Sequence, residues 1–322
     1  MTASGPDGGR RPGLWVFASL FLVTVVVTGG FVTVTQGPNP SGSSAQADAP
    51  FPPGTSSDGV ENVSRLVDAH RSVLTAAGTF RVERRINASR PAGSPRPDRW
   101  KWNQTGVHRF ALDATPPRSV HRRRVVRSGS LVQLQHFATP SEWHTRVRRN
   151  ASDWTSRAAS RNLTADTFRA WALDHSLESS LSAFAFEYDG RVERADSNET
   201  VYRFVSTGYR DDMRPGPRRL PNAIDAATAV LLVDERGMVV ALETRYAGTA
   251  TATTEPGAQV TVNVSVRYRW SFSTLDGATV DEPDWVDSRE PSLTGQVAAG
   301  RERPTRTRFG GPGPGWCRVR VG

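Results

Sequence analysis

The clearest pattern of hydrophobic and polar positions in this chain is a two-residue alternation over residues 260–272. Every second side chain there is apolar, and the residues between them are polar or charged. Because successive side chains of a strand point to opposite faces, the pattern predicts a long antiparallel strand with one buried face, in a strongly curved sheet. The apolar positions are Val260, Val262, Val264, Val266, Tyr268, Trp270 and Phe272.

Shorter segments repeat this alternation. Residues 79–86 alternate, with Arg84 as the exception on the apolar side. The segment HRRRVVRSGSLVQLQHF predicts a hairpin with its turn near Ser128 and Gly129. The segment ATAVLLVDERGMVVALETRY predicts a tight hairpin in which Gly237 takes a positive φ.

Two segments change to helical spacing. Apolar residues recur every three or four positions over residues 60–74, where Ser57 or Asp58 can cap the start and Gly78 can end the helix. His70 lies on this apolar face and is expected to pack in the core. Residues 165–188 predict a second helix, whose apolar face carries Leu173, Leu177, Leu181 and Phe184.

The N-terminal part contains an uncharged apolar stretch that ends at Thr35. As a helix, residues 14–35 would be about 33 Å long, enough to cross the core of a bilayer. Arg10 and Arg11 precede the stretch, so residues 1–13 are expected in the cytoplasm. Since no A-x-A-like cleavage site follows, we favour an uncleaved transmembrane anchor, with a cleaved signal peptide as the alternative.

Composition divides the remaining chain. Residues 36–57 are rich in Pro, Gly and Ser and predict a flexible linker, and residues 58–287 carry the periodic patterns of a folded domain. Residues 288–322 have no periodicity and predict a disordered basic tail. The net charge is +9, and that tail holds about five of these charges, so the domain is only mildly basic and we expect no nucleic-acid partner.

The asparagines indicate the compartment. The chain has nine, and seven of them begin an Asn-x-Ser/Thr triplet, whereas chance predicts roughly one or two. We therefore expect a single-pass protein of the cell membrane whose bulk lies outside the cytoplasm and is N-glycosylated. The alternative is that these residue types simply co-occur in polar turns. The candidate sites are Asn62, Asn87, Asn103, Asn150, Asn162, Asn198 and Asn263.

Signatures of catalysis are few. No phosphate-binding glycine loop, G-x-S-x-G or H-E-x-x-H motif occurs. The six histidines have no i, i+4 pair and no evident carboxylate partner, although His136 and His144 could approach each other across a hairpin. A single cysteine, Cys317, excludes an intramolecular disulfide and a Cys-based zinc site. We expect no enzyme activity, no cofactor and no metal.

The densest basic run is HRRRVVR, residues 121–127. Alternation places Arg122 and Arg124 on one face of its strand and Arg123 on the other, so the run by itself forms no one-sided stripe. It predicts either a solvated strand or attraction to anionic lipid headgroups or surface glycans.

An apolar ligand between helix and sheet would contact the apolar face of the second helical segment. Ordinary core packing is the alternative explanation for these residues. The candidates for lining such a cleft are Phe168, Trp171, Leu177, Leu181 and Phe184.

The order of elements resembles a known family. The elements are, in order, an apolar leader, a low-complexity linker, the helix in AHRSVLTAAGTFRVERR, a middle helix, the hairpin in VDERGMVVALETRY, the long alternating strand and DEPDWV. This order is similar to that of haloarchaeal cell-surface lipoproteins of LolA/LppX-like architecture. The similarity covers roughly residues 60–287. This chain departs from that family where Thr28-Gly29-Gly30-Phe31 replaces the lipid-bearing cysteine, and in its basic charge.

The resemblance implies an α+β fold, mainly antiparallel β, in which a curved, half-open barrel sheet holds two or three helices on its concave side. Related folds carry lipids or lipoproteins in the apolar cleft between them. We therefore expect a monomeric, membrane-anchored binding domain for a lipid or another apolar ligand. The alternative is a structural or interaction protein of the cell surface that holds no ligand.

Overall fold

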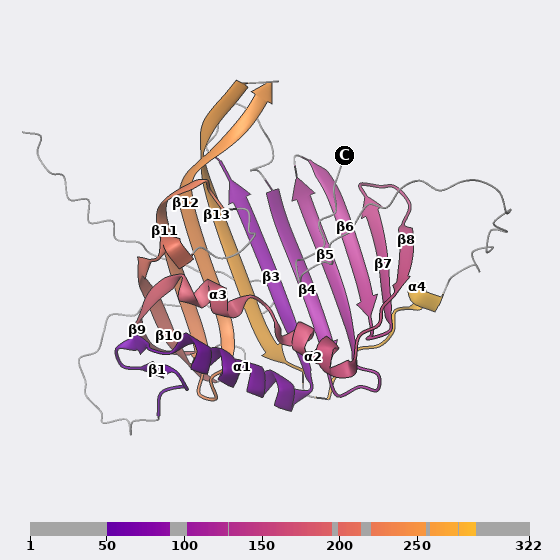
Figure 1. Ribbon diagram of the computed structural model, residues 1–322, viewed down its shortest axis with the longest axis horizontal. Helices are drawn as coiled ribbons and strands as arrows, with labels where there is room; N and C mark the ends of the chain where they lie inside the picture. The colour runs from indigo at the N-terminus through magenta and orange to yellow at the C-terminus, as the bar shows by residue number, and fades with distance from the viewer. Residues whose placement is uncertain are drawn as a thin grey trace, which may run out of the picture. The chain divides into compact units, whose positions relative to one another are not determined.

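A computed structural model describes residues 50–90, 102–127, 129–194, 199–213, 220–255, 258–275 and 277–287. Apart from Arg194, these residues belong to one compact unit. Its main feature is an open antiparallel sheet of eleven strands in the order β8-β7-β6-β5-β4-β3-β13-β12-β11-β10-β9 (Figure 1). The predicted mainly antiparallel β fold is therefore confirmed.

The strands of this sheet are β3 (Thr79–Ser89), β4 (Trp102–Ala111), β5 (Arg118–Arg127), β6 (Ser130–Ala138), β7 (Glu142–Arg149), β8 (Thr155–Ser160), β9 (Phe184–Glu193), β10 (Thr200–Tyr209), β11 (Ala223–Asp234), β12 (Val239–Glu255) and β13 (Ala258–Thr274). A separate small hairpin pairs β1 (Thr55–Ser56) with β2 (Gly59–Val60). The helices are α1 (Val63–Ala77), α2 (Ala165–Leu173), α3 (Leu177–Ser182) and α4 (Asp284–Asp287), with a 3-10 turn over Asp211–Met213.

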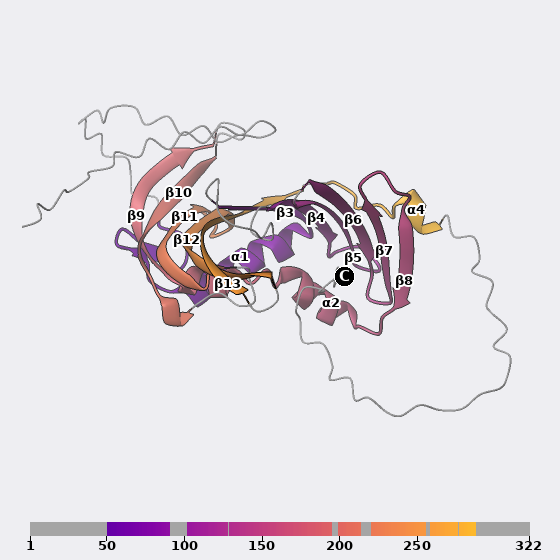
Figure 2. The same ribbon diagram turned by 90° about the horizontal axis from the view of Figure 1, so that it is seen from above.

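The topology explains where the helices lie. Strands β3 to β8 and β9 to β13 form two meanders, which meet where β13 pairs with β3 in the middle of the sheet. Since β8 and β9 are the two edge strands, the chain between them must cross a face of the sheet, and α2 and α3 make that crossing (Figure 1). Helix α1 lies on the same face, which we call the inner face, and the sheet bends around these helices (Figure 2).

The predicted central strand and tight hairpin are confirmed. Even-numbered side chains of β13 are buried from Val262 to Phe272, whereas Asn263 on the opposite face is exposed. In the β11–β12 hairpin Gly237 has a φ of +91°. The Asp234 carboxylate closes the turn by accepting a hydrogen bond of 2.7 Å from the backbone N–H of Met238.

Helix α1 begins later than predicted. Ser57 and Asp58 lie in the β1–β2 hairpin, and Asn62 is the residue whose side chain caps the helix, accepting a hydrogen bond from the N–H of Arg65 at 2.9 Å. Gly78 ends it as predicted, with a φ of +66°. His70 is a core residue, as expected: it is 1% exposed, and its Nδ1 accepts a hydrogen bond from the backbone N–H of Val239.

The predicted second helix is divided. Thr164 caps α2, and Ser176 adopts a left-handed conformation with a φ of +55° between α2 and α3. Phe184 begins β9 and pairs with Tyr209 of β10. The regular spacing of apolar residues therefore continues through the break between α2 and α3 and into β9. The spacing does not reveal these boundaries, because all three elements bury the same side of the segment.

The structure tests the predictions about the two ends of the chain only in part. The prediction of a flexible linker is wrong for residues 51–56, which are at least partly buried, with the Phe51 ring 5.1 Å from Tyr188 and 5.5 Å from Tyr202. Residues 36–49 of that linker lie outside the described residues. The transmembrane segment 14–35, residues 1–13 and the basic tail 288–322 lie outside the described residues. Among the residues that are described, no helix is long and apolar enough to cross a membrane.

Candidate functional site

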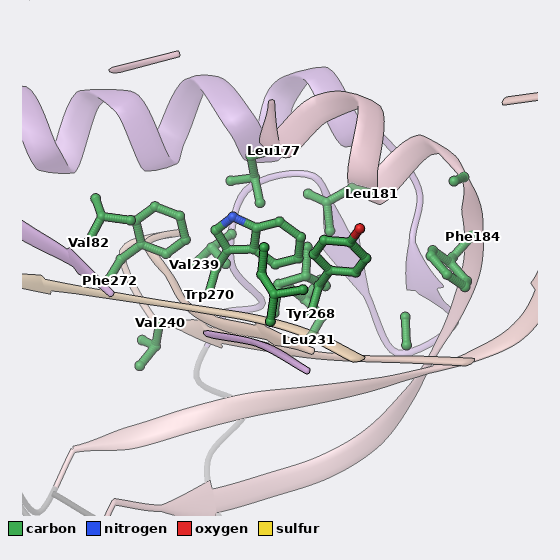
Figure 3. Packing of buried hydrophobic residues seen from close by; sticks show 14 of the residues in the cluster. Val82, Leu177, Leu181, Phe184, Leu231, Val239, Val240, Tyr268, Trp270 and Phe272 are labelled. Carbon is green, nitrogen blue, oxygen red and sulfur yellow. The ribbon is translucent and has the colours of Figure 1, made fainter. Parts of the chain in front are cut away.

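The five apolar residues proposed to line a cleft lie between the helices and the sheet. Phe168 and Leu181 are 0% exposed, and Leu177 and Phe184 are also buried. Leu177 and Leu181 point from α3 towards Trp270 and Tyr268 of β13 (Figure 3). These four residues therefore pack against the protein's own side chains.

A pocket of about 510 Å³ lies elsewhere and contains none of the five residues. It is open, and most of its lining residues are small or polar; they come from the end of β3, the start of β11 and the middle of β12 and β13, and include Asp225, Asn263 and Ser265. Its apolar side chains are limited to Ala247 and Val264, which is less apolar lining than a lipid chain would need.

Trp171 differs from the other four because it is only partly buried. Its ring lies 5.8 Å from His108 and 6.1 Å from Trp143, at angles of 65° and 69°. Trp171 thus marks the point where the closed core ends and a more open part of the inner face begins.

A row of three histidines runs across that part of the sheet. His108 of β4 pairs directly with His121 of β5, which pairs directly with His136 of β6. Their rings stack, with centroids 4.9 Å and 5.6 Å apart and interplanar angles of 25° and 17°. Gly106 helps to accommodate the row, because a Cβ at this position would lie 3.2 Å from Nε2 of His121.

The histidine row is uncharged at neutral pH. Burial, followed by the neighbouring His136 and Arg123, lowers the pKa of His121 to about 3. Burial, followed by Arg123, lowers the pKa of His136 to about 4, and burial, followed by the other histidines, lowers the pKa of His108 well below its ordinary value. The rings therefore act as neutral hydrogen-bonding groups.

Polar and aromatic side chains complete one end of the row. His136 Nδ1 lies 2.8 Å from the hydroxyl of Thr145, and that hydroxyl also accepts a hydrogen bond of 2.7 Å from the indole N–H of Trp143. The Arg161 guanidinium lies 4.5 Å from the centre of the Trp143 ring and 5.7 Å from Trp171. This end of the inner face is thus cationic and aromatic.

The neighbouring rows combine apolar side chains with positive charge. Arg84 of β3, Gly106 of β4 and Arg123 of β5 follow one another in register. Further along the inner face the side chains are partly buried and apolar. They are Val125, Val132, Leu134 and Val147. We call these residues, together with Arg84, Arg123 and the histidine row, the inner trough.

The opposite face of the same strands is basic. The prediction that HRRRVVR forms no one-sided stripe is correct for the run itself, but neighbouring strands supply further arginines beside Arg122 and Arg124. We call this surface the outer arginine face. Its members are Arg85, Arg109, Arg122, Arg124, Arg146 and Arg148.

His136 and His144, which could have met across a hairpin, lie on opposite faces, because His136 pairs with Thr145 and His144 points to the outer face. His144 instead has a carboxylate partner: its Nε2 lies 2.7 Å from Oε2 of Glu142. Within the part of the chain that the structure describes, no group of three or more His, Cys, Asp or Glu side chains is arranged to hold a metal ion.

The sequon asparagines are on the surface wherever they are described. The outer face carries Asn87, Asn103 and Asn263, and Asn87 pairs directly with Asn103. Asn198 lies outside the described residues. The exposed sequon asparagines are Asn62, Asn87, Asn103, Asn150, Asn162 and Asn263.

Sequence reasoning missed the histidine row although a signal for part of it existed. His121 and His136 are equally distant from the turn at Ser128 and Gly129, so a two-residue hairpin pairs them. His108 joins them only through the register of β4 with β5, which no turn pattern in the sequence predicted. Compared with known proteins, the chain matches no family model, and no curated protein matches it.

Proposed function

We propose that this chain is an extracytoplasmic binding domain for an amphipathic anion, such as a lipid with a carboxylate or phosphate group. The observation that carries the proposal is the inner trough, where cationic and apolar side chains share one partly buried surface. The anionic group of the ligand would lie near Arg84 and Arg123, because guanidinium groups bind carboxylates and phosphates in planar geometry.

The apolar part of the ligand would cover Val125, Val132, Leu134 and Val147. Burial of apolar surface contributes about 25 cal/mol per Å², so a lipid chain laid over these residues would gain several kcal/mol. The neutral histidines beside them offer hydrogen bonds without a competing charge. We therefore place the ligand in the inner trough and not between α3 and β13, where Leu177 and Leu181 are already packed in the core.

The wider setting of the proposal is a membrane-anchored, LolA/LppX-like protein with the segment 14–35 as its anchor. The open sheet bent around helices on one face supports that resemblance (Figure 2). The exposure of the described sequon asparagines supports an extracytoplasmic, glycosylated domain. Packing of Phe168, Leu177 and Leu181 in the core supports the alternative, a cell-surface interaction protein without a ligand.

Binding of a fluorescent fatty acid to the full chain tests the proposal. Val125→Glu should weaken binding about tenfold or more, since it places a negative charge and a desolvation cost in the inner trough. Val126→Glu is the matched control, because Val126 is the next residue of β5 and faces outward. Equal affinity of the two variants, or no binding by the wild-type chain, would favour the alternative without a ligand.

A further inference from the structure

The outer arginine face lies on strands whose order and register place its charges in rows. Arg85 of β3, Arg124 of β5 and Arg148 of β7 lie in one such row, with the uncharged Thr105 and Gln133 between them. Neighbouring strands are about 4.8 Å apart, so charges on every second strand recur at about 10 Å. A parallel row repeats that interval with Arg122 and Arg146 on β5 and β7.

These charges are only partly neutralised. Arg85 lies 2.6 Å from the carboxylate of Glu83. Among the described residues, however, no carboxylate lies within ion-pair distance of Arg109, Arg122 or Arg124, all of which are exposed. Burial, followed by repulsion from Arg122 and Arg148, lowers the pKa of Arg146. An anion at this surface would therefore relieve repulsion between like charges.

The arginines at the β7 end are held in fixed directions. Arg146 donates two hydrogen bonds, of 3.0 Å and 2.8 Å, to Oε1 of Gln135, and Arg148 donates two, of 2.8 Å and 2.5 Å, to Oε1 of Gln133. The Arg146 guanidinium also lies 4.6 Å from the centre of the Trp154 ring and 4.9 Å from that of Trp285. Such preorganisation reduces the conformational entropy that binding would cost.

We propose that the outer arginine face binds a linear acidic polysaccharide that carries one anionic group on every second sugar. An extended pair of sugar units is similar in length to the distance between arginines on alternate strands. Trp154 and Trp285 lie beside Arg146 at the end of the rows, and both rings are partly exposed, so a sugar can contact the parts that Arg146 leaves uncovered. This surface is on the opposite side of the sheet from the inner trough and does not depend on the ligand proposed there.

Other anionic partners fit the surface less well. Headgroups of a fluid bilayer rearrange to match any pattern of charge, so they would not require rows with a fixed interval. A nucleic-acid strand carries a phosphate at every nucleotide, which is a shorter interval than two strands of the sheet. Charge complementarity together with spacing therefore favours the polysaccharide.

The test is titration of the full chain with short hyaluronan oligosaccharides, in which every second sugar bears a carboxylate. We expect binding that weakens with salt. Combined Arg85→Gln, Arg124→Gln and Arg148→Gln should reduce the affinity about tenfold or more, because charge-assisted hydrogen bonds are lost. The matched control removes the same charge from exposed arginines elsewhere, with Arg65→Gln, Arg157→Gln and Arg210→Gln, and should bind as the wild-type chain does.

Any of the following three results would overturn the proposal. Equal losses in the two triple variants would mean that only the net charge matters. Binding to phosphatidylglycerol vesicles without binding to hyaluronan would indicate a membrane-docking surface instead. Equally tight binding of a single-stranded oligonucleotide would indicate a general polyanion surface. Circular dichroism of both triple variants shows whether a loss of affinity reflects a loss of fold.

Discussion

At the scale of single residues, position in the sheet decides what an ionisable side chain does. His121 and Arg122 are neighbours in sequence, yet His121 lies in the inner trough with a lowered pKa and Arg122 is an exposed cation on the outer face. The cause is the pleat, which sends successive side chains to opposite faces. Burial penalises the charged form of the inward residue, whereas water solvates the charge of the outward one.

The lowered histidine pKa values predict an acid-sensitive fold. The unfolded chain binds a proton at His121 near its ordinary pKa of 6.5, whereas the folded protein does so only at about 3. The unfolded state therefore binds more protons between these values, and stability is lost as the pH falls below 6.5. Between pH 6.5 and pH 5, proton uptake by His121 in the unfolded chain should lower the free energy of unfolding by about 2 kcal/mol.

Urea unfolding at pH 7 and pH 5 checks this prediction with His121→Asn, which cannot take up a proton. The variant should lose about 2 kcal/mol less than the wild-type chain between the two pH values. An identical loss in both proteins would show that His121 is not the source of the acid sensitivity.

At the scale of elements, turns are determined by local chemistry and by what packs against them. The β11–β12 turn contains Gly237 because of its φ of +91°, and also because a Cβ there would lie 2.8 Å from that of Ala69 in α1. The β5–β6 turn contains Gly129, with a φ of +83° and no atom within 4 Å of such a Cβ. The first turn thus supports helix docking, and the second only reverses the chain.

The two glycines form a matched pair of variants. Both Gly237→Ala and Gly129→Ala introduce strain at a positive φ, of roughly 1 kcal/mol. Only Gly237→Ala also forces α1 away from the turn, so it should destabilise the protein by about 1–3 kcal/mol more than Gly129→Ala. Thermal or urea unfolding of the two variants measures this difference, and equal destabilisation would mean that α1 adjusts without cost.

At the scale of the whole described unit, one sheet presents two surfaces of different chemistry. The inner face holds the core, the helices and the inner trough, while the outer face carries the arginines and three sequon asparagines. Asn87 and Asn103 are separated in sequence but paired across β3 and β4, so their Cβ atoms are about 5 Å apart. Two bulky glycans cannot both fit easily at that distance.

Glycopeptide mapping should therefore find Asn87 and Asn103 modified on different molecules if the chain is glycosylated. The intact mass of the protein would then correspond to one glycan at this pair, and Asn87→Gln should increase the occupancy of Asn103. Asn263 on β13 serves as a comparison, since its paired residue Thr249 carries no sequon. Full occupancy of both Asn87 and Asn103 on one molecule would contradict the prediction.

The sequence by itself determined the local elements. Alternation from Val260 to Phe272 is sufficient for a half-buried strand, and Gly237 and Gly78 specify a turn and a helix end through their freedom at positive φ. The spacing of apolar residues failed to predict the helix break at Ser176, because the elements on both sides of it bury one continuous apolar side. The sequence also predicted the cap of α1 several residues too early. These signals act over a few residues and can be read without knowing the fold.

Only the tertiary structure decided which distant residues share a surface. His108 meets His121, and Arg85 joins a row with Arg124 and Arg148, through pairings between strands. A shift of one residue in any pairing would move those side chains to the other face. The register is set by the summed burial of the whole sheet, so the chemistry of both candidate sites is a property of the fold and not of any segment.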